Sequence, residues 1–235
     1  MTPLLEVRGL RAAYERIEVV RGVSLAVNQG EVVALLGPNG AGKSTTLKVI
    51  AGLMPASGGD ILLDGRRVNG ARPDDLARAG VCLIPEGRGV FPNLTVRENL
   101  RVATHVGRTQ AEVESAAFER FPRLAERRDQ LAGTMSGGEQ QMLALARGLA
   151  SDPAVLLLDE LSMGLAPLIV ESLYERVAAI AREGVSIVLV EQFARVVLDV
   201  AARAAIMVHG AIRSWGTPQE LASELQLAYL GGGSH

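Results

Sequence analysis

The segment GPNGAGKST at residues 37–45 constrains the fold of this chain more than any other feature. It satisfies the pattern G-x-x-x-x-G-K-[ST], in which a glycine-rich loop joins a strand to a helix. The run EVVALL at residues 31–36 precedes it and is apolar after its first residue, as in a strand buried on both faces. A helical pattern follows from Lys43 to Ala51. The sequence therefore predicts the strand, loop and helix that this motif requires.

The residue types in this loop predict a phosphate-binding site. Glycines let backbone N–H groups point inward at phosphate oxygens, and the helix N-terminus adds the positive end of its dipole. Lys43 is one of only two lysines in the chain; we expect it to contact the β- and γ-phosphates, and Ser44 to bind Mg²⁺. The predicted nucleotide-binding residues of the loop are Gly37, Pro38, Asn39, Gly40, Ala41, Gly42, Lys43, Ser44 and Thr45. The alternative is a glycine-rich turn that only joins two elements.

Strands and helices alternate along the rest of the chain, which predicts an α/β fold with a mostly parallel sheet. A mostly helical stretch at about 88–150 interrupts this order and is expected to be an insertion. We expect one domain over residues 1–230 and a flexible tail at 231–235, because 48% hydrophobic residues suffice for one large core. The predicted strands are 4–8, 18–27, 31–36, 59–64, 81–84, 155–158, 185–190, 203–208 and 211–215; further helices are predicted at 168–182 and after Thr217-Pro218.

Composition excludes several classes of function. The formal net charge of −2 argues against a general nucleic-acid binder. The single cysteine, Cys82, permits no disulfide within the chain and lies in an apolar run, as a small core residue does. The three histidines show no metal-ligand spacing. No secretory signal or membrane-spanning run is recognisable, so any work at a membrane is expected to require a partner protein.

The run AVLLLDE at residues 154–160 predicts a second part of the site. It is an apolar strand that ends in two carboxylates. Asp159 is expected to hold Mg²⁺, and Glu160 is expected to accept a proton from an attacking water. Many strands end in acids only because they reach the surface, so this interpretation depends on the phosphate-binding loop upstream.

The segment MSGGEQQ at residues 135–141 precedes a helical stretch. Ser136, Gly137 and Gly138 can present a hydroxyl and backbone N–H groups at a helix start, which would form a second anion site. The alternative is an ordinary serine N-cap followed by flexible glycines.

Taken together, the loop at 37–45, the SGGE segment and the Asp159-Glu160 pair resemble the nucleotide-binding subunits of ATP-binding cassette (ABC) transporters over nearly the whole chain. The resemblance implies a P-loop NTPase (RecA-like) core, an antiparallel β subdomain and a helical insertion. In that family two ATPase subunits pair head to tail, which implies that Ser136, Gly137, Gly138 and Glu139 bind ATP held by the partner. It also implies that Tyr14 stacks on adenine; the alternative is a half-buried aromatic residue of a strand.

Four positions differ from the common family pattern. Glu86 replaces a glutamine that contacts Mg²⁺ and water, and Gln192 replaces a histidine that contacts the γ-phosphate. Leu161 replaces a proline and Ala166 an aspartate. The segments that contain most of these changes are PEGRGVF (85–91), SMGLAP (162–167) and VEQ (190–192). Together they resemble the second ATPase subunit of branched-chain amino acid importers.

The resemblance also assigns roles near these positions. Gln192 is expected to be a polar contact to the γ-phosphate that cannot take up charge near neutral pH. Its neighbour Glu191 is expected to face solvent because of its place at the end of a strand, independently of the resemblance. The segment from Glu86 to Leu94 is expected to contact a membrane subunit, with Val90 and Phe91 as its apolar contacts or, alternatively, as core residues.

We therefore expect an ATPase that converts ATP and water to ADP and phosphate and drives import, with Glu160, Lys43, Gln192 and Glu86 catalytic and with Ser44, Asp159 and Glu86 holding Mg²⁺. The implied partners are a second ATPase subunit (as a heterodimer or homodimer), permease subunits and, indirectly, an extracytoplasmic solute-binding protein, but no nucleic acid. The implied location is the cytoplasmic face of the membrane, as a peripheral protein. The alternatives are import of urea or another small solute, export, or a regulatory module with weak hydrolysis.

Overall fold

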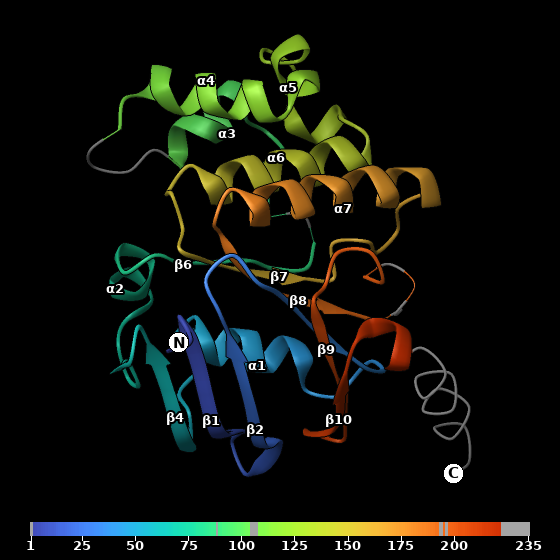
Figure 1. Cartoon of the computed structure of the whole chain (residues 1–235). Helices are drawn as coiled ribbons and strands as arrows, with labels where there is room; N and C mark the ends of the chain where they lie inside the picture. The colour runs from blue at the N-terminus through green and yellow to red at the C-terminus, as the bar shows by residue number, and fades with distance from the viewer. Residues whose placement is uncertain (1, 88, 104–107, 193–194, 196, 222–235) are drawn as a thin grey trace.

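The computed structural model describes residues 2–87, 89–103, 108–192, 195 and 197–221 (Figure 1). Within them lie two sheets and several helices. The larger sheet has six strands in the order β10-β9-β3-β8-β7-β6, and the smaller one has four in the order β2-β1-β4-β5. The tail predicted at 231–235 lies outside the described residues.

The larger sheet contains β3 (Val32–Leu36), β6 (Val81–Ile84), β7 (Val155–Asp159), β8 (Ser186–Glu191), β9 (Arg203–Val208) and β10 (Ala211–Gly216). All neighbouring pairs are parallel except β9 and β10, which form an antiparallel hairpin at one edge. Alternate residues of β3 belong to two different hydrophobic clusters on opposite faces of the sheet. Burial on both faces explains why these strands are continuous apolar runs in the sequence.

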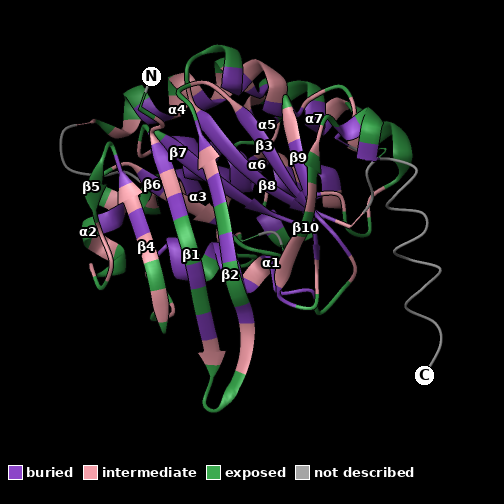
Figure 2. Ribbon diagram, turned by 60° about the horizontal axis from the view of Figure 1, so that its bottom comes forward, coloured by how far each residue is buried: buried purple, intermediate pink, exposed green. Residues whose placement is uncertain are grey.

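The smaller sheet is wholly antiparallel and contains β1 (Leu5–Tyr14), β2 (Ile17–Val27), β4 (Gly58–Leu63) and β5 (Arg66–Arg67). Buried and exposed residues alternate along β1 and β2 (Figure 2), because one face covers the core and the other meets water. Figure 1 shows helix α1 (Lys43–Ile50) between the two sheets.

Between β6 and β7 the described chain is helical, as the sequence predicts. The elements are α3 (Val96–Val102), α4 (Gln110–Arg120), α5 (Pro122–Glu126), the 3-10 helix η1 (Ala132–Thr134) and α6 (Gly137–Leu149). They lie together at one end of the molecule, beside α7 (Pro167–Arg182), which covers the face of the larger sheet opposite α1 (Figure 1). Capping boxes begin α3 at Thr95, α4 at Thr109 and α6 at Ser136.

The predicted fold class, an α/β P-loop core with an antiparallel sheet and a helical insertion, is confirmed. The differences concern boundaries. β1 extends to Tyr14 rather than ending at residue 8, because register shifts after Val7 break the alternation that reveals a strand. The short helix α2 (Pro73–Arg78) carries too few residues to show a helical period in the sequence. In the described part of the chain, none of the helices has the length and apolar character needed to cross a membrane.

Candidate nucleotide-binding site

The glycine-rich loop is held tightly from behind by β9 and β2. A Cβ atom at Gly37 would lie 2.1 Å from the carbonyl oxygen of Met207, so a larger residue at this position would displace the loop. The backbone N–H of Gly210 donates to the carbonyl oxygen of Ala41 at 2.9 Å, and the backbone N–H of Arg21 donates to Gly210 at 2.7 Å. Asn39 and Gly40 are exposed at the apex of the loop. The sequence alone gave no indication that Met207 and Gly210 support this loop.

Lys43 lies inside the loop and is almost fully buried. Its Nζ atom donates to the carbonyl oxygen of Gly37 at 2.9 Å and to that of Pro38 at 3.1 Å. The same atom lies 3.3 Å from the Oε1 atom of Glu160. These three oxygens fix the ammonium group at the first turn of α1, where helix dipole and charge both favour an anion.

Ser44 and Asp159 meet across the gap between α1 and β7. The Ser44 hydroxyl donates to the Oδ1 atom of Asp159 at 2.8 Å. Burial raises the pKa of Asp159, and the negative charges of Glu160 and Glu86 raise it further, while the bond from Ser44 and the charge of Lys48 lower it. A hydroxyl next to a carboxylate is a set of hard oxygen donors, which suits Mg²⁺. Thr45, the next residue on α1, is also buried.

Glu160 has a left-handed backbone, with a φ angle of 47°, immediately after β7. This conformation is uncommon for residues other than glycine and is often found at functional sites. The backbone N–H of Glu160 donates to the carbonyl oxygen of Val190 at 3.0 Å, which joins this turn to β8. The side chain is thereby turned back toward Lys43 rather than along the strand.

Glu86 and Gln192 flank this centre. Glu86 is exposed, but its charge contributes to the raised pKa of Asp159, so it lies within electrostatic range of the site. Gln192 follows β8 and is partly buried. An open cavity of about 690 Å³ lies against Glu160, Ser162, Glu191 and Gln192.

The prediction that Glu191 faces solvent is wrong. Its side chain is 1% exposed and accepts hydrogen bonds from the hydroxyl groups of Tyr174 and Ser162. All six residues of β8 are buried, so the strand has no alternation of buried and exposed residues from which the burial of Glu191 could be predicted. Ser162 begins the SMGLAP segment, but the sequence assigned it no role, and Tyr174 lies in a predicted helix without any functional motif.

Ser136, Gly137, Gly138 and Glu139 form the N-terminus of α6. The Ser136 hydroxyl and backbone N–H both donate to the Oε2 atom of Glu139, at 2.8 and 2.9 Å. Arg127 lies 2.6 Å from Glu139. Gly138 packs so closely on Ile169 of α7 that a Cβ atom there would lie 2.3 Å from a methyl carbon. In the described residues, these side-chain bonds stay within the helical region and do not reach Lys43 or Asp159.

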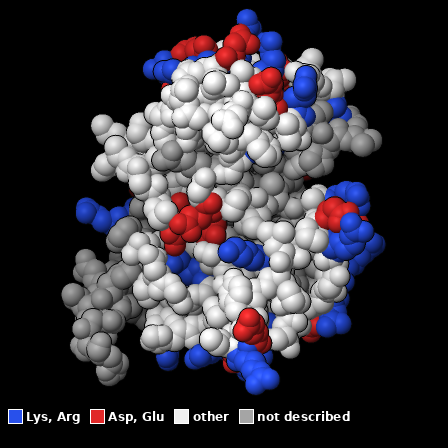
Figure 3. Space-filling view, turned by 180° about the vertical axis from the view of Figure 1, so that it is seen from behind, with Lys and Arg blue, Asp and Glu red and all other residues white. Residues whose placement is uncertain are grey.

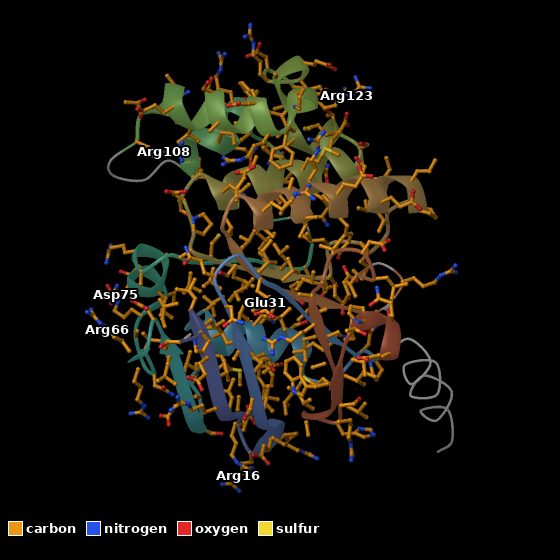
Figure 4. All side chains as sticks on the ribbon, viewed as in Figure 1. Arg16, Glu31, Arg66, Asp75, Arg108 and Arg123 are labelled. Atoms are coloured by element: carbon orange, nitrogen blue, oxygen red, sulfur yellow. The ribbon has the colours of Figure 1, made fainter. Side chains whose placement is uncertain are left out.

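Two aromatic residues have surroundings that bear on their predicted roles. Tyr14 ends β1, pairs with Ile17 and is 48% exposed, so it is not a core residue. It stands next to the β1–β2 turn from which Arg16 projects (Figure 4). Phe91 is 45% exposed, and the guanidinium of Arg147 lies 4.6 Å from its ring centre. Val90 packs against the main core instead.

The substituted position Leu161 has a structural explanation. Its side chain is 1% exposed and belongs to the main hydrophobic cluster, so it fills space in the core.

On the face drawn in Figure 3, acidic side chains gather at mid-height, between the helices above and the strands below.

This arrangement of loop, helix and strand ends matches known proteins. A family described as "ABC transporter" matches residues 20–162. This chain belongs to the ABC transporter family. The match covers the glycine-rich loop, the SGGE segment and the Asp159-Glu160 pair, so the predicted resemblance is confirmed and the chain is an ABC-type ATPase.

Relatives with assigned functions extend the match to most of this ABC ATPase. It is 44% identical over 224 residues to the high-affinity branched-chain amino acid transport ATP-binding protein BraG of Pseudomonas aeruginosa, covering 93% of this chain and 96% of that one. It is 35% identical to the probable branched-chain amino acid transport ATP-binding protein LivF of Archaeoglobus fulgidus, over 90% and 91% of the two chains. It is 33% identical to the lipopolysaccharide export system ATP-binding protein LptB of Haemophilus influenzae, over 97% of each.

Solved structures agree on the fold. An ATP-binding cassette of an ABC transporter in its ADP conformation superimposes with a TM-score of 0.87, at 23% identity, over 98% of this chain and 100% of that one. A second ATP-binding subunit of an ABC transporter gives a TM-score of 0.80 at 30% identity, over 97% and 98%.

Proposed function

We propose that this ABC ATPase drives the import of branched-chain amino acids. The observation that carries the ATPase chemistry is the convergence of Lys43, Ser44, Asp159 and Glu160, which two bonds join across α1 and β7. The similarity to BraG and LivF, both named for branched-chain amino acid transport, supports the class of solute. The transported solute does not contact this subunit in our proposal.

The positions of the side chains and the membership of the ABC transporter family support the proposed roles. Glu160 accepts the proton of the attacking water, and Lys43 stabilises charge on the transferred phosphoryl group. Ser44, Asp159 and Glu86 hold Mg²⁺, which neutralises phosphate charge when bound. Gln192 contacts the γ-phosphate as a neutral donor and acceptor. Tyr14, half exposed at the end of β1, stacks on adenine.

The remaining roles require partners. We propose that the segment at 136–139, whose described side-chain bonds do not reach Lys43 or Asp159 of the same chain, closes over ATP held by a second ATPase subunit, in a heterodimer or homodimer. The segment from Glu86 to Leu94 contacts a permease subunit, which places the protein peripherally at the cytoplasmic face of the membrane. An extracytoplasmic solute-binding protein acts indirectly. We also propose one ABC ATPase domain over residues 1–230, with a helical subdomain at about 88–150; residues 222–230 lie outside the described part of the chain.

The base assignment is tested with Glu160→Gln. This variant is expected to bind ATP but to release phosphate about 100-fold more slowly than the wild type, because the proton acceptor is lost. The matched control is Glu175→Gln on α7, which removes an exposed carboxylate and should keep wild-type turnover. Equal phosphate release by Glu160→Gln and wild type would refute the assignment.

The solute class is tested in proteoliposomes that contain the assembled transporter. ATP-dependent uptake of leucine, isoleucine or valine is the expected result, and uptake of urea alone would replace the proposed solute. Export is a second candidate, because the chain is 33% identical to the lipopolysaccharide export protein LptB. Export from inside-loaded vesicles without any uptake would favour it.

A further inference from the structure

Glu191 is the last residue of β8 and its carboxylate is enclosed by donors from three directions. The backbone N–H of Ser162 donates to Oε1 at 3.1 Å, and the Ser162 hydroxyl donates to Oε2 at 2.8 Å. The hydroxyl of Tyr174, on α7, donates to Oε1. The backbone N–H of Gln192 lies 3.3 Å from Oε2. One buried carboxylate thus links β8, the loop after β7 and α7.

Such a group is expensive to bury. Burial raises the pKa of Glu191, although its hydrogen bonds lower it and so oppose the effect. Burial and the charge of Glu191 together raise the pKa of Tyr174 well above its usual value, which keeps the phenol protonated as a donor. Apolar residues of similar volume usually stabilise a core as well as a buried charge does. Core stability therefore does not account for a carboxylate at this position.

The position of the loop does account for it. Ser162 lies two residues after Glu160, and the two residues are bonded to β8 in succession: Glu160 N–H to Val190, and Ser162 N–H to Glu191. Between these bonds the backbone of Glu160 has its left-handed φ of 47°. A conformation of this kind persists only when surrounding bonds determine it. The carboxylate of Glu191 accepts the second of these two N–H bonds, which join the turn to β8.

We infer that Glu191 is a positioning residue that, with Ser162 and Tyr174, fixes the Glu160 turn against the end of β8. The same bonds place Gln192, the next residue, beside that turn. This inference rests on the proposed function, because it assumes that Glu160 accepts the proton. The clamp of Glu191, Ser162 and Tyr174 has no described bond of its own to Lys43 or the glycine-rich loop and is connected to Lys43 only through Glu160. We therefore expect it to act on the geometry of hydrolysis more than on ATP binding.

The test is steady-state ATP hydrolysis by Glu191→Gln, because the amide keeps the volume but cannot accept all four donors. We expect kcat to fall about 10- to 100-fold, as for misplaced catalytic groups, while KM for ATP changes less than about twofold. Tyr174→Phe and Ser162→Ala each remove one donor and should give smaller falls of about three- to tenfold in kcat. Glu183→Gln, just after α7, is the matched control, because it removes an exposed carboxylate that accepts hydrogen bonds from Arg120.

A double variant separates positioning from general damage. Ser162→Ala combined with Glu191→Gln should be no slower than Glu191→Gln alone, since both changes break one unit. A fall in thermal stability with unchanged kcat in all three single variants would overturn the inference. If Glu191→Gln does not fold, Tyr174→Phe and Ser162→Ala decide by the same criterion, a fall in kcat with a nearly unchanged KM for ATP. Slow hydrolysis by Glu160→Gln with normal hydrolysis by the clamp variants would refute only this inference, whereas normal hydrolysis by Glu160→Gln would refute the proposed function.

Discussion

The Nζ atom of Lys43 lies 3.3 Å from the Oε1 atom of Glu160, and the two side chains are 3% and 10% exposed. One group begins α1 and the other follows β7, so the order of strands in the sheet brings them together. This ion pair can form only when α1 and the end of β7 are packed in their native positions.

Replacing Lys43 tests the anion site. Lys43→Met should weaken ATP binding about 10- to 100-fold, because charge-assisted hydrogen bonds to the phosphates are lost. Lys48→Met is the control, because Lys48 is the other lysine of the chain and is exposed on the same helix. Isothermal titration with ATP gives both dissociation constants. Equal weakening by the two variants would mean that only the net charge matters.

Replacing Tyr14 tests adenine stacking. Tyr14→Ala should raise the dissociation constant for ATP about tenfold, because stacking of a base on an aromatic ring contributes roughly 1–3 kcal/mol. Tyr14→Phe keeps the ring and should bind as the wild type does. Fluorescence competition with an ATP analogue provides the measurement. Weak binding by both variants would point to the hydroxyl instead of the ring.

Replacing Gln192 tests the pH dependence of turnover. Gln192→Ala should lower turnover, and no step in the wild-type pH profile should arise at this position, because an amide does not titrate near neutral pH. Gln192→His should add a step at about pH 6.5, near the usual pKa of histidine. The profiles of kcat in the assembled transporter show the difference. Normal turnover by Gln192→Ala would leave this strand end with a structural role only.

We predict that the charged form of Asp159 lowers the free energy of unfolding of the protein without ligand. Its pKa is raised by burial, so the folded protein without ligand disfavours the charged form, and stability from this group falls as pH rises through that raised pKa. Asp159→Asn should therefore increase the free energy of unfolding at pH 7 and lose the added stability that Mg-ATP gives. Below about pH 4 the two proteins should converge, because the aspartate is then protonated in both states. Urea unfolding at several pH values tests the sign, and a less stable Asp159→Asn at pH 7 would contradict it.

Ala166 leaves the N-terminus of α7 without a side-chain cap. Ala166→Asp should stabilise the protein by about 1 kcal/mol, because an aspartate at this position can accept a backbone N–H of the first turn and interact with the helix dipole. Ala166→Gln is the control, since it is polar but a poor cap. Thermal unfolding of the three proteins measures the effect; a gain in both variants would indicate a cause other than capping.

Several features of the site were predictable because they are local. The spacing within residues 37–45 and the two carboxylates that follow an apolar strand require no knowledge of distant residues. The burial of Glu191 and the packing of Leu161 could not be predicted, because each depends on which distant element covers the residue. Phe91 is similar: its contact with Arg147 joins segments that are far apart in the chain.

The sequence by itself determined the class of fold and the residues that form the phosphate-binding loop, since the loop motif and the periodicity of strands and helices each depend only on residues that are close in the sequence. Only the tertiary structure decided that Lys43 meets Glu160, that Ser44 meets Asp159, and that Glu191 is a buried acceptor rather than a surface acid. The physical reason is that strand order and the packing of α7 set these contacts, and a single strand end looks the same in the sequence whether water or a tyrosine hydroxyl faces its carboxylate.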